Sequence, residues 1–168
     1  IIVMEITIEA KDLNQALSRI IGVVQHKSSR PILTCVLVNA SQDGVLVLES
    51  TNIDISVSVT VPVTVNTAGR VAVPARKFAD YLGTLSGGTV TLSADEEGRV
   101  TVVSSRGRSE LAGYPGADFP STQSFEDLQF TSLAGAELKS MLSQTIKCAS
   151  TDDSRFSLVG VYVHRLSD

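Results

Sequence analysis

The feature that most constrains the fold is a corner from a strand into a helix that occurs three times with the same spacing. At each corner an apolar residue ends a strand, and two more apolar residues follow five and nine positions later, where a helix places them on one face. Successive corners are 65 and then 60 residues apart. The three trios are Ile8, Leu13 and Leu17; Val73, Phe78 and Leu82; and Leu133, Leu138 and Leu142. A recurring period of this kind indicates a duplicated supersecondary unit, here a strand, a helix and a run of strands.

The segments around these corners alternate between two periodicities. Spacing of apolar residues by three and four predicts helices over 11–24, about 74–85 and about 135–148. Alternation of apolar and polar residues, with many Val, Ile and Thr, predicts strands at 4–9, 45–50, 54–61, 89–94 and 99–104. We expect further strands at 71–73, before the second helix, and at 156–163, after the third.

Two such units would form one domain of the α+β class, with two helices on one face and an antiparallel sheet on the other. The first two units occupy 4–117. The stretch 114–127, with Pro115, Gly116, Pro120 and several Ser and Thr residues, reads as a linker, whose limits we place at 118–125. A third unit covers 126–168, with a strand, a helix and one more strand. A lone strand, helix and strand have little to pack against, so we expect a truncated second domain.

Composition places the chain among soluble globular proteins, with 43% hydrophobic and 19% charged residues in a total of 168. No apolar run approaches the roughly 20 residues that span a bilayer, so no membrane partner is expected. The first ten residues lack the basic flank and the cleavage site of a signal peptide. Cys35 and Cys148 are too few for a disulfide framework. These features predict a cytoplasmic protein with free thiols.

Positive charge is concentrated in the predicted helices and the residues just after them, 10–30, 74–86 and 134–150. These segments have a net charge of +5, whereas the rest of the chain has −9. Their basic residues are Lys11, Arg19, Lys27, Arg30, Arg76, Lys77, Lys139 and Lys147. The helical layer of this acidic protein is therefore predicted to be its positive face.

One interpretation of this face is a set of ordinary solvated helix surfaces, which is what most charge runs prove to be. The other is a surface for a polyanion, with the remaining acidic surface repelling it. Lys11 and Arg19, with Gln15 between them, form a solvent stripe at helical spacing. Lys and Arg without interleaved aromatic residues suit contact with a nucleic-acid backbone rather than base reading.

The sequence gives little support to an enzyme. His26 and His164 have no second His or Cys at ligand spacing, so no metal site is expected. The glycines of 86–88 and 107 lead into strands, whereas a phosphate-binding loop of the Walker type opens a helix. The acidic run 95–97 reads as a hairpin tip. We therefore expect no catalytic residue and no cofactor.

Four motifs occur along the chain in a fixed order: SRPIL at 29–33, VPARKF at 73–78, ADFP at 117–120 and DDSRFSLVGVYV at 152–163. Together they resemble the beta sliding clamp of bacterial DNA polymerase III. The resemblance implies the DNA-clamp fold and a non-enzymatic processivity factor that encircles duplex DNA and tethers the polymerase. It further implies a homodimeric ring of three-domain protomers, with polymerase and clamp-loader subunits as partners when the protein is full length.

The same resemblance implies which residues contact DNA without regard to sequence. Lys27 matches the basic residue after the first helix, and Arg76 with Lys77 matches the PARKF motif. Phe156 matches an aromatic position in the second domain, although Ser157 stands where the family commonly has a second aromatic residue, and Asp152 is unfavourable near phosphate. Most of the family's peptide-binding pocket lies outside a chain of this length. The C-terminal HRLSD, 164–168, lacks the Asp-Gly that precedes a similar pocket motif.

A different class of function stays open beside the clamp. The chain could be a protein-interaction scaffold of the α+β type without a role on DNA. In that case the exposed strand edges of the truncated third unit would pair with another chain.

Overall fold

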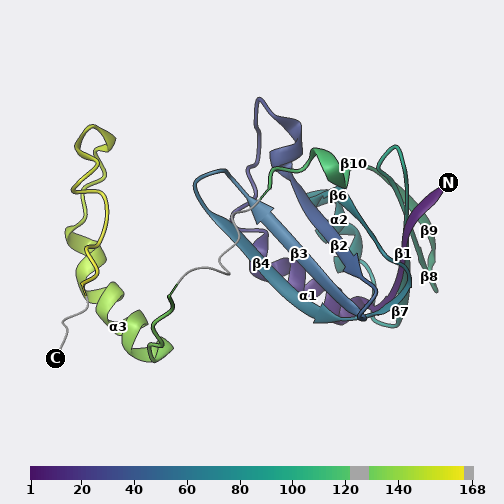
Figure 1. The fold of residues 1–168 in the computed structure, drawn as a ribbon, viewed down its shortest axis with the longest axis horizontal. Coiled ribbons are helices and arrows are strands. Elements are labelled where there is room, and N and C mark those ends of the chain that lie inside the picture. The colour runs from purple at the N-terminus through teal and green to yellow at the C-terminus, as the bar shows by residue number, and fades with distance from the viewer. Residues whose placement is uncertain (122–128, 165–168) are drawn as a thin grey trace. The chain divides into compact units, whose positions relative to one another are not determined.

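The computed structural model describes residues 1–121 and 129–164 (Figure 1). The chain divides into two compact units, 1–123 and 124–168. The first unit carries both sheets, and the second has helices, turns and irregular structure, with no strand in its described residues.

The first unit contains two equivalent sets of elements, each made of a strand, a helix and three strands. The first set is β1 (Ile2–Glu9), α1 (Ala10–Ile20), the 3-10 helix η1 (Pro31–Thr34), β2 (Cys35–Ser41), β3 (Val45–Thr51) and β4 (Ser56–Pro62). After β5 (Thr64–Thr67), the second set is β6 (Gly69–Pro74), α2 (Ala75–Gly83), β7 (Thr89–Asp95), β8 (Arg99–Ser104) and β9 (Gly107–Ala112). β10 (Tyr114–Pro115) and η2 (Gly116–Asp118) follow. The duplicated unit predicted from the corners is therefore confirmed.

The two sets exchange their first strands. The sheets have the orders β5-β1-β7-β8-β9 and β10-β6-β2-β3-β4, and the strand pairs are antiparallel. β1 thus pairs with β7 of the second set, where Ile6 lies opposite Leu92. In the other sheet β6 pairs with β2 of the first set, where Val71 lies opposite Val38. Neither set has a complete sheet without the other, so the two sets fold as one domain.

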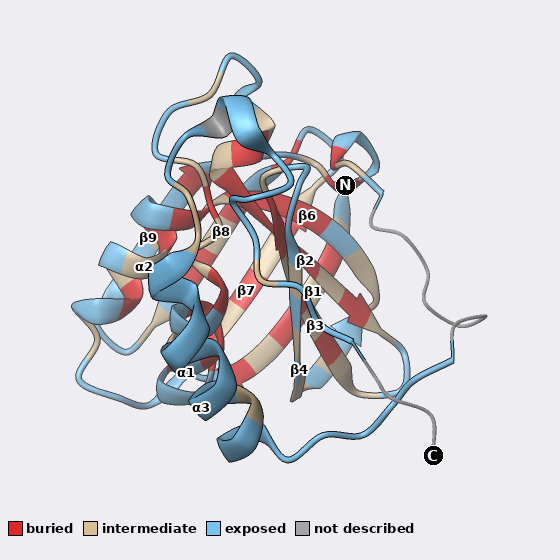
Figure 2. Cartoon of the chain, turned by 90° about the vertical axis from the view of Figure 1, so that its left-hand side faces the viewer, coloured by how far each residue is buried: buried red, intermediate tan, exposed pale blue. Residues whose placement is uncertain are grey.

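The apolar core lies between the strands and the helices. All six residues of the first two trios are buried, and they belong to one hydrophobic cluster with inward residues of both sheets. Figure 1 shows α1 and α2 behind β2, β3 and β4, so both helices cover the same side of these strands. Buried positions line the inner faces of strands and helices, and exposed positions line the outer faces (Figure 2). This is the α+β arrangement that the sequence predicted.

The strand β2 was missed in the sequence because it is covered on both faces. Val36, Val38 and Ala40 join the main core, whereas Cys35 and Leu37 pack on the opposite face with Ala72 and Phe119. A strand buried on both faces shows no alternation of apolar and polar residues. The other missed strands, β5, β9 and β10, are short or lie at sheet edges.

Helix α1 is shorter than its apolar spacing predicted. It ends at Ile20 rather than at residue 24. The next turn is tightened, because Val23 N–H donates to the Ile20 carbonyl and Val24 N–H to the Ile21 carbonyl, each three residues back. Val24 is nevertheless buried. The apolar period therefore predicted burial correctly and the helix end wrongly.

In the second unit α3 (Gly135–Thr145) continues into η3 (Ile146–Cys148), and η4 (Asp153–Arg155) follows. The predicted strand at 156–163 is wrong, because these residues form turns and irregular structure. The strand expected from 126 is likewise not found at 129–134, and 126–128 lie outside the described residues. A strand needs a partner for its N–H and C=O groups, and no strand is found within 129–164 to provide one. The third trio is consequently not buried: Leu133 and Leu142 are exposed.

The predicted linker, 118–125, is described only up to residue 121. Within it Phe119 is only 6% exposed and packs against Cys35, Leu37 and Ala72. The chain thus stays attached to the first unit at least as far as this ring. The domain limits 4–117 and 126–168 stay a prediction.

Candidate nucleic-acid interface

The basic residues of the PARKF motif stand at the first turn of α2. Pro74 ends β6 with φ −56° and ψ 107°, and the helix begins at Ala75, which is buried. Arg76 and Lys77 follow and are exposed. Two cations at the positive end of a helix dipole cost about 0.3–1 kcal/mol each when exposed. An anion at this place would offset that cost and would also meet the free N–H groups of the helix start.

Arg76 is connected to the loop that follows α1. Its Nη2 atom lies 2.7 Å from His26 Nε2, and both side chains are exposed. Lys27, also exposed, is the next residue after His26. The structure therefore brings the loop of Lys27, just before the SRPIL motif, close to Arg76 and Lys77 of the VPARKF motif. These are the two places that the resemblance assigned to DNA contact in the first unit. We call His26, Lys27, Arg76 and Lys77 the basic corner.

The two helices run in opposite directions, with the start of each beside the exit of the other. At one end Arg76 meets His26, and at the other end Ala10 N–H donates to the Gly88 carbonyl at 2.9 Å. Lys11 and Arg76 are the second residues of α1 and α2, so they occupy equivalent places in the duplication. The opposed directions place Lys11 and the basic corner at opposite ends of the helical layer.

The solvent stripe predicted on α1 is present. Lys11, Gln15 and Arg19 are all exposed, whereas Leu13 and Leu17 between them are buried. Arg19 lines a shallow groove together with Gln15 and residues 60–62 of β4. It stands near the end of α1, close in sequence to the loop that carries His26 and Lys27. The stripe thus continues from the start of α1 toward the basic corner.

The cations of this layer are not held in ion pairs within the described residues. The ion pairs formed among the described residues are Arg99 with Glu97, Arg108 with Glu110, and Arg155 with Asp152. Within that part of the chain Lys11, Arg19, Lys27, Arg76 and Lys77 have no carboxylate within ion-pair distance. No ion pair in that part of the chain therefore opposes their attraction for an anion that approaches the helices.

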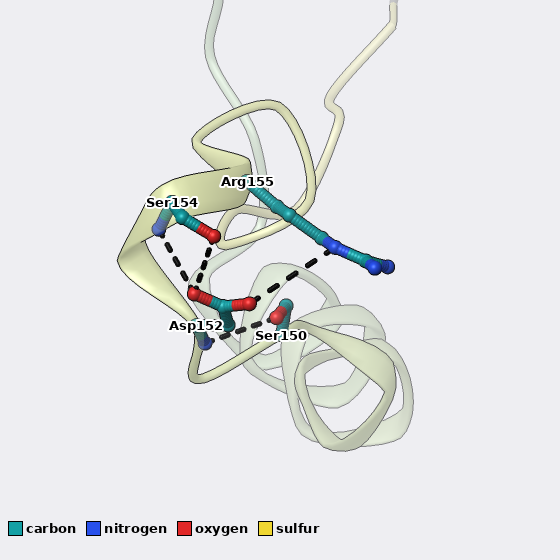
Figure 3. A network of polar contacts seen from close by, with 4 residues as sticks. All are labelled: Ser150, Asp152, Ser154 and Arg155. Carbon is teal, nitrogen blue, oxygen red and sulfur yellow. Dashed lines mark hydrogen bonds and ion pairs between the residues drawn. The ribbon is translucent and has the colours of Figure 1, made fainter.

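Phe156 lies in the second unit, apart from these residues in the sequence, and 82% of it is exposed. It follows η4, whose turn is built on Asp152 (Figure 3). The Asp152 carboxylate accepts bonds from the Ser154 N–H and hydroxyl and lies 4.0 Å from Arg155 Nε. The hydrogen bonds from Ser154 lower the pKa of Asp152, so this carboxylate stays charged. Arg155 faces it and is not a free cation.

The residue that sequence reasoning missed is His26. It was considered only as a metal ligand, and among the described residues no three His, Cys, Asp or Glu side chains gather at a possible metal site. The available signal was its place directly before Lys27, at a helix exit. What the sequence does not contain is the approach of this exit to Arg76, which depends on how the two helices pack.

Exposed cations at the exit of one helix and the start of another can bind phosphates, and such contacts carry no information about base sequence. Residues 4–123 match the family model described as DNA polymerase III beta subunit, N-terminal domain. The chain belongs to the DNA polymerase III beta subunit family.

Individual members of the DNA polymerase III beta subunit family show the extent of the similarity. The beta sliding clamp of Vibrio cholerae is 32% identical over 161 residues, which are 94% of this chain and 43% of the relative. A crystal structure of a DNA polymerase III subunit beta sliding clamp from Bartonella birtlesii, bound to griselimycin, superposes with a TM-score of 0.87 at 31% identity. It covers 98% of this chain and 44% of the other. A sliding clamp structure from Caulobacter crescentus gives a TM-score of 0.90 at 27% identity, covering 98% and 45%.

The fold of these solved beta subunits is the DNA-clamp fold, which this chain shares. The chain spans less than half the length of the relatives named above. Within the described residues, no helix has the length and apolar character needed to cross a membrane.

Proposed function

We propose that this chain is part of a sliding clamp, a processivity factor that encircles duplex DNA and tethers the replicative polymerase. The observation that carries the proposal is the basic corner, where two motifs far apart in the sequence meet through Arg76 and His26. The family membership supports the same conclusion. The role is binding and not catalysis.

The contacts proposed are weak and indifferent to sequence. Lys27, Arg76 and Lys77 would contact phosphates at the basic corner, with Lys11 and Arg19 along α1 and Phe156 in the second unit. Long exposed side chains on a helical layer give a diffuse attraction, which lets the protein slide along the duplex. Topological enclosure by a ring would then supply the hold that these contacts lack.

The remaining parts of the proposal follow from the family and concern the full-length protein. We propose a homodimeric ring, with polymerase and clamp-loader subunits as the protein partners. The compartment proposed is the bacterial cytoplasm, which agrees with the free thiols of Cys35 and Cys148.

The test is a titration of the 168-residue chain against two unrelated duplexes, by fluorescence anisotropy, at about 50 and about 200 mM salt. We expect weak binding that falls steeply with salt and is equal for the two duplexes. The double variant Arg76→Ala, Lys77→Ala should bind more weakly with its circular dichroism unchanged. The matched control is Arg99→Ala, Arg108→Ala, which removes the same charge from cations that already face carboxylates. A strong preference for one duplex, or binding that ignores salt, would refute the proposal.

A scaffold role is the second candidate, and the second unit provides the observation that favours it. The strand edges expected there are absent from 129–164, but an apolar surface is exposed instead. Leu133, Met141 and Leu142 line a groove of about 550 Å³ with Tyr162 and Val163. Sedimentation distinguishes the two roles. Self-association that persists in the Arg76→Ala, Lys77→Ala variant, together with no binding to DNA, favours the scaffold.

A further inference from the structure

We propose that His26 is a positioning residue that holds the Arg76 guanidinium in place for contact with phosphate. The inference rests on the proposed DNA-binding function and adds a residue to it. It starts from the distance of 2.7 Å between Arg76 Nη2 and His26 Nε2.

The chemistry of the two side chains fixes their roles in this contact. A guanidinium only donates hydrogen bonds and keeps its proton in proteins. His26 Nε2 must therefore be the acceptor, so the imidazole is neutral and its proton is on Nδ1. The contact thus specifies one of the two neutral tautomers of His26.

A neutral acceptor orients Arg76 without cancelling its charge. A carboxylate in the same place would hold the guanidinium equally well but would oppose the approach of phosphate. The bond to His26 uses one N–H of Nη2, and the guanidinium retains four other N–H donors. The side chain is therefore held at one edge while the rest of the fork can still donate to a phosphate oxygen.

Both ends of the contact stand on anchored backbone. Val24, two residues before His26, is buried in the main core. Two residues after it, Ser28 Oγ accepts from the Arg30 N–H at 3.1 Å and so fixes the turn of the loop. On the other side the helix holds Arg76, and its neighbour Ala75 is fully buried. Two exposed side chains on anchored backbones can keep a defined geometry, which a free arginine would lose.

The charges around the pair are mainly positive, with Lys27 and Arg30 on the loop and Lys77 on α2; Asp80 lies one turn further along α2. A neutral His26 adds no further positive charge next to the Arg76 guanidinium. The neutral form is therefore the one that suits a positioning role.

The test uses two replacements of His26 in the full 168-residue chain. His26→Leu removes the acceptor at similar size, and His26→Gln can keep an acceptor at about the reach of Nε2. Freeing a side chain that binding must order again weakens affinity by about two- to tenfold. We expect that loss in His26→Leu and an affinity within about twofold of wild type in His26→Gln. In the Arg76→Ala background, His26→Leu should change nothing further, because the two residues act as one pair.

A second measurement tests the contact between His26 and Arg76 in the absence of DNA. We expect the ¹⁵N NMR spectrum of the wild type to show His26 with its proton on Nδ1, and Arg76→Ala to reduce that preference. A proton on Nε2 in the wild type would overturn the inference, and so would equal DNA affinity of wild type and His26→Leu. Failure of the proposed function looks different: the wild type would show no salt-dependent binding to either duplex.

Discussion

The Arg76 guanidinium lies 2.7 Å from His26 Nε2, although 50 residues separate the two in the sequence. The contact joins the exit of α1 to the start of α2. At the other end of the helix pair, Ala10 N–H bonds to the Gly88 carbonyl. Each repeat thus fixes the position of the other at both ends, and the first of these junctions carries the exposed cations Lys27, Arg76 and Lys77.

The exchange of β1 and β6 explains why the core residues of the two repeats are interdependent. Leu17 is fully buried in a cluster built from both sheets. Leu142 occupies the same place in the third repeat, but 37% of it is exposed. Leucines at the same place in the sequence pattern are therefore expected to contribute differently to stability in the two units.

We predict that Leu17→Ala lowers the free energy of unfolding by about 2–5 kcal/mol, because it removes buried atoms and leaves a cavity. The matched change Leu142→Ala should cost less than about 1 kcal/mol, since the side chain is already in contact with solvent. Urea unfolding followed by circular dichroism measures both. Equal losses would mean that Leu142 is as well buried as Leu17.

Much of the fold could be predicted from the sequence because local spacing determines it. The helices begin at Ala10, Ala75 and Gly135, and these starts repeat the intervals of 65 and 60 residues read from the trios. The predictions that failed concern segments whose structure depends on contacts with residues distant in the sequence. β2 is covered on both faces and shows no alternation, and residues 156–163 lack strand partners within 129–164.

Three residues of the basic corner, Lys27, Arg76 and Lys77, were predicted from the sequence, but His26 and the assembly of the corner were not. Lys27 and Arg76 were identified by resemblance, and their exposure agrees with that role. Their approach through His26 results from the opposed packing of two helices, which no local pattern encodes. The contacts of Asp152 with Ser154 and Arg155, next to Phe156 in the sequence, were likewise not predictable from composition and spacing.

Ser50 stands on the face of β3 that alternation assigns to the core, beside the buried Leu46 and Leu48. Its hydroxyl donates to the Ile20 carbonyl at 2.9 Å, at the last residue of α1. We predict that Ser50→Ala costs about 1 kcal/mol of stability, because a buried hydrogen bond to the helix end is lost. The exposed Ser58→Ala on β4 serves as the control in the same urea titration. If Ser50→Ala proves as neutral as the control, the bond contributes nothing to the helix end.

Ile53, in the connection between β3 and β4, has φ of +85°, a conformation that is strained for a β-branched residue. Thr51 Oγ1 accepts its N–H and helps to hold this geometry. We predict that Ile53→Gly raises the free energy of unfolding by about 1 kcal/mol, since glycine adopts positive φ without strain. Ile55→Gly, at an equally exposed position of the same loop where φ is not positive, should lower it by about 0.5–1 kcal/mol. Changes of the same sign in both variants would show that the strain at Ile53 is not relieved by glycine.

Burial raises the pKa of the Cys35 thiol from 9.0 to about 11, and a hydrogen bond with Thr34 opposes part of that rise. The folded protein therefore keeps a proton that the unfolded chain releases above pH 9. Stability from this group is complete below pH 9 and is lost as the pH rises through about 11. We predict that the wild type loses up to about 2 kcal/mol more across this range than Cys35→Ala. Cys148→Ala is the control, because that thiol is exposed and its removal should leave the wild-type profile unchanged. Parallel profiles for wild type and Cys35→Ala, measured by urea unfolding in steps of pH, would contradict the prediction.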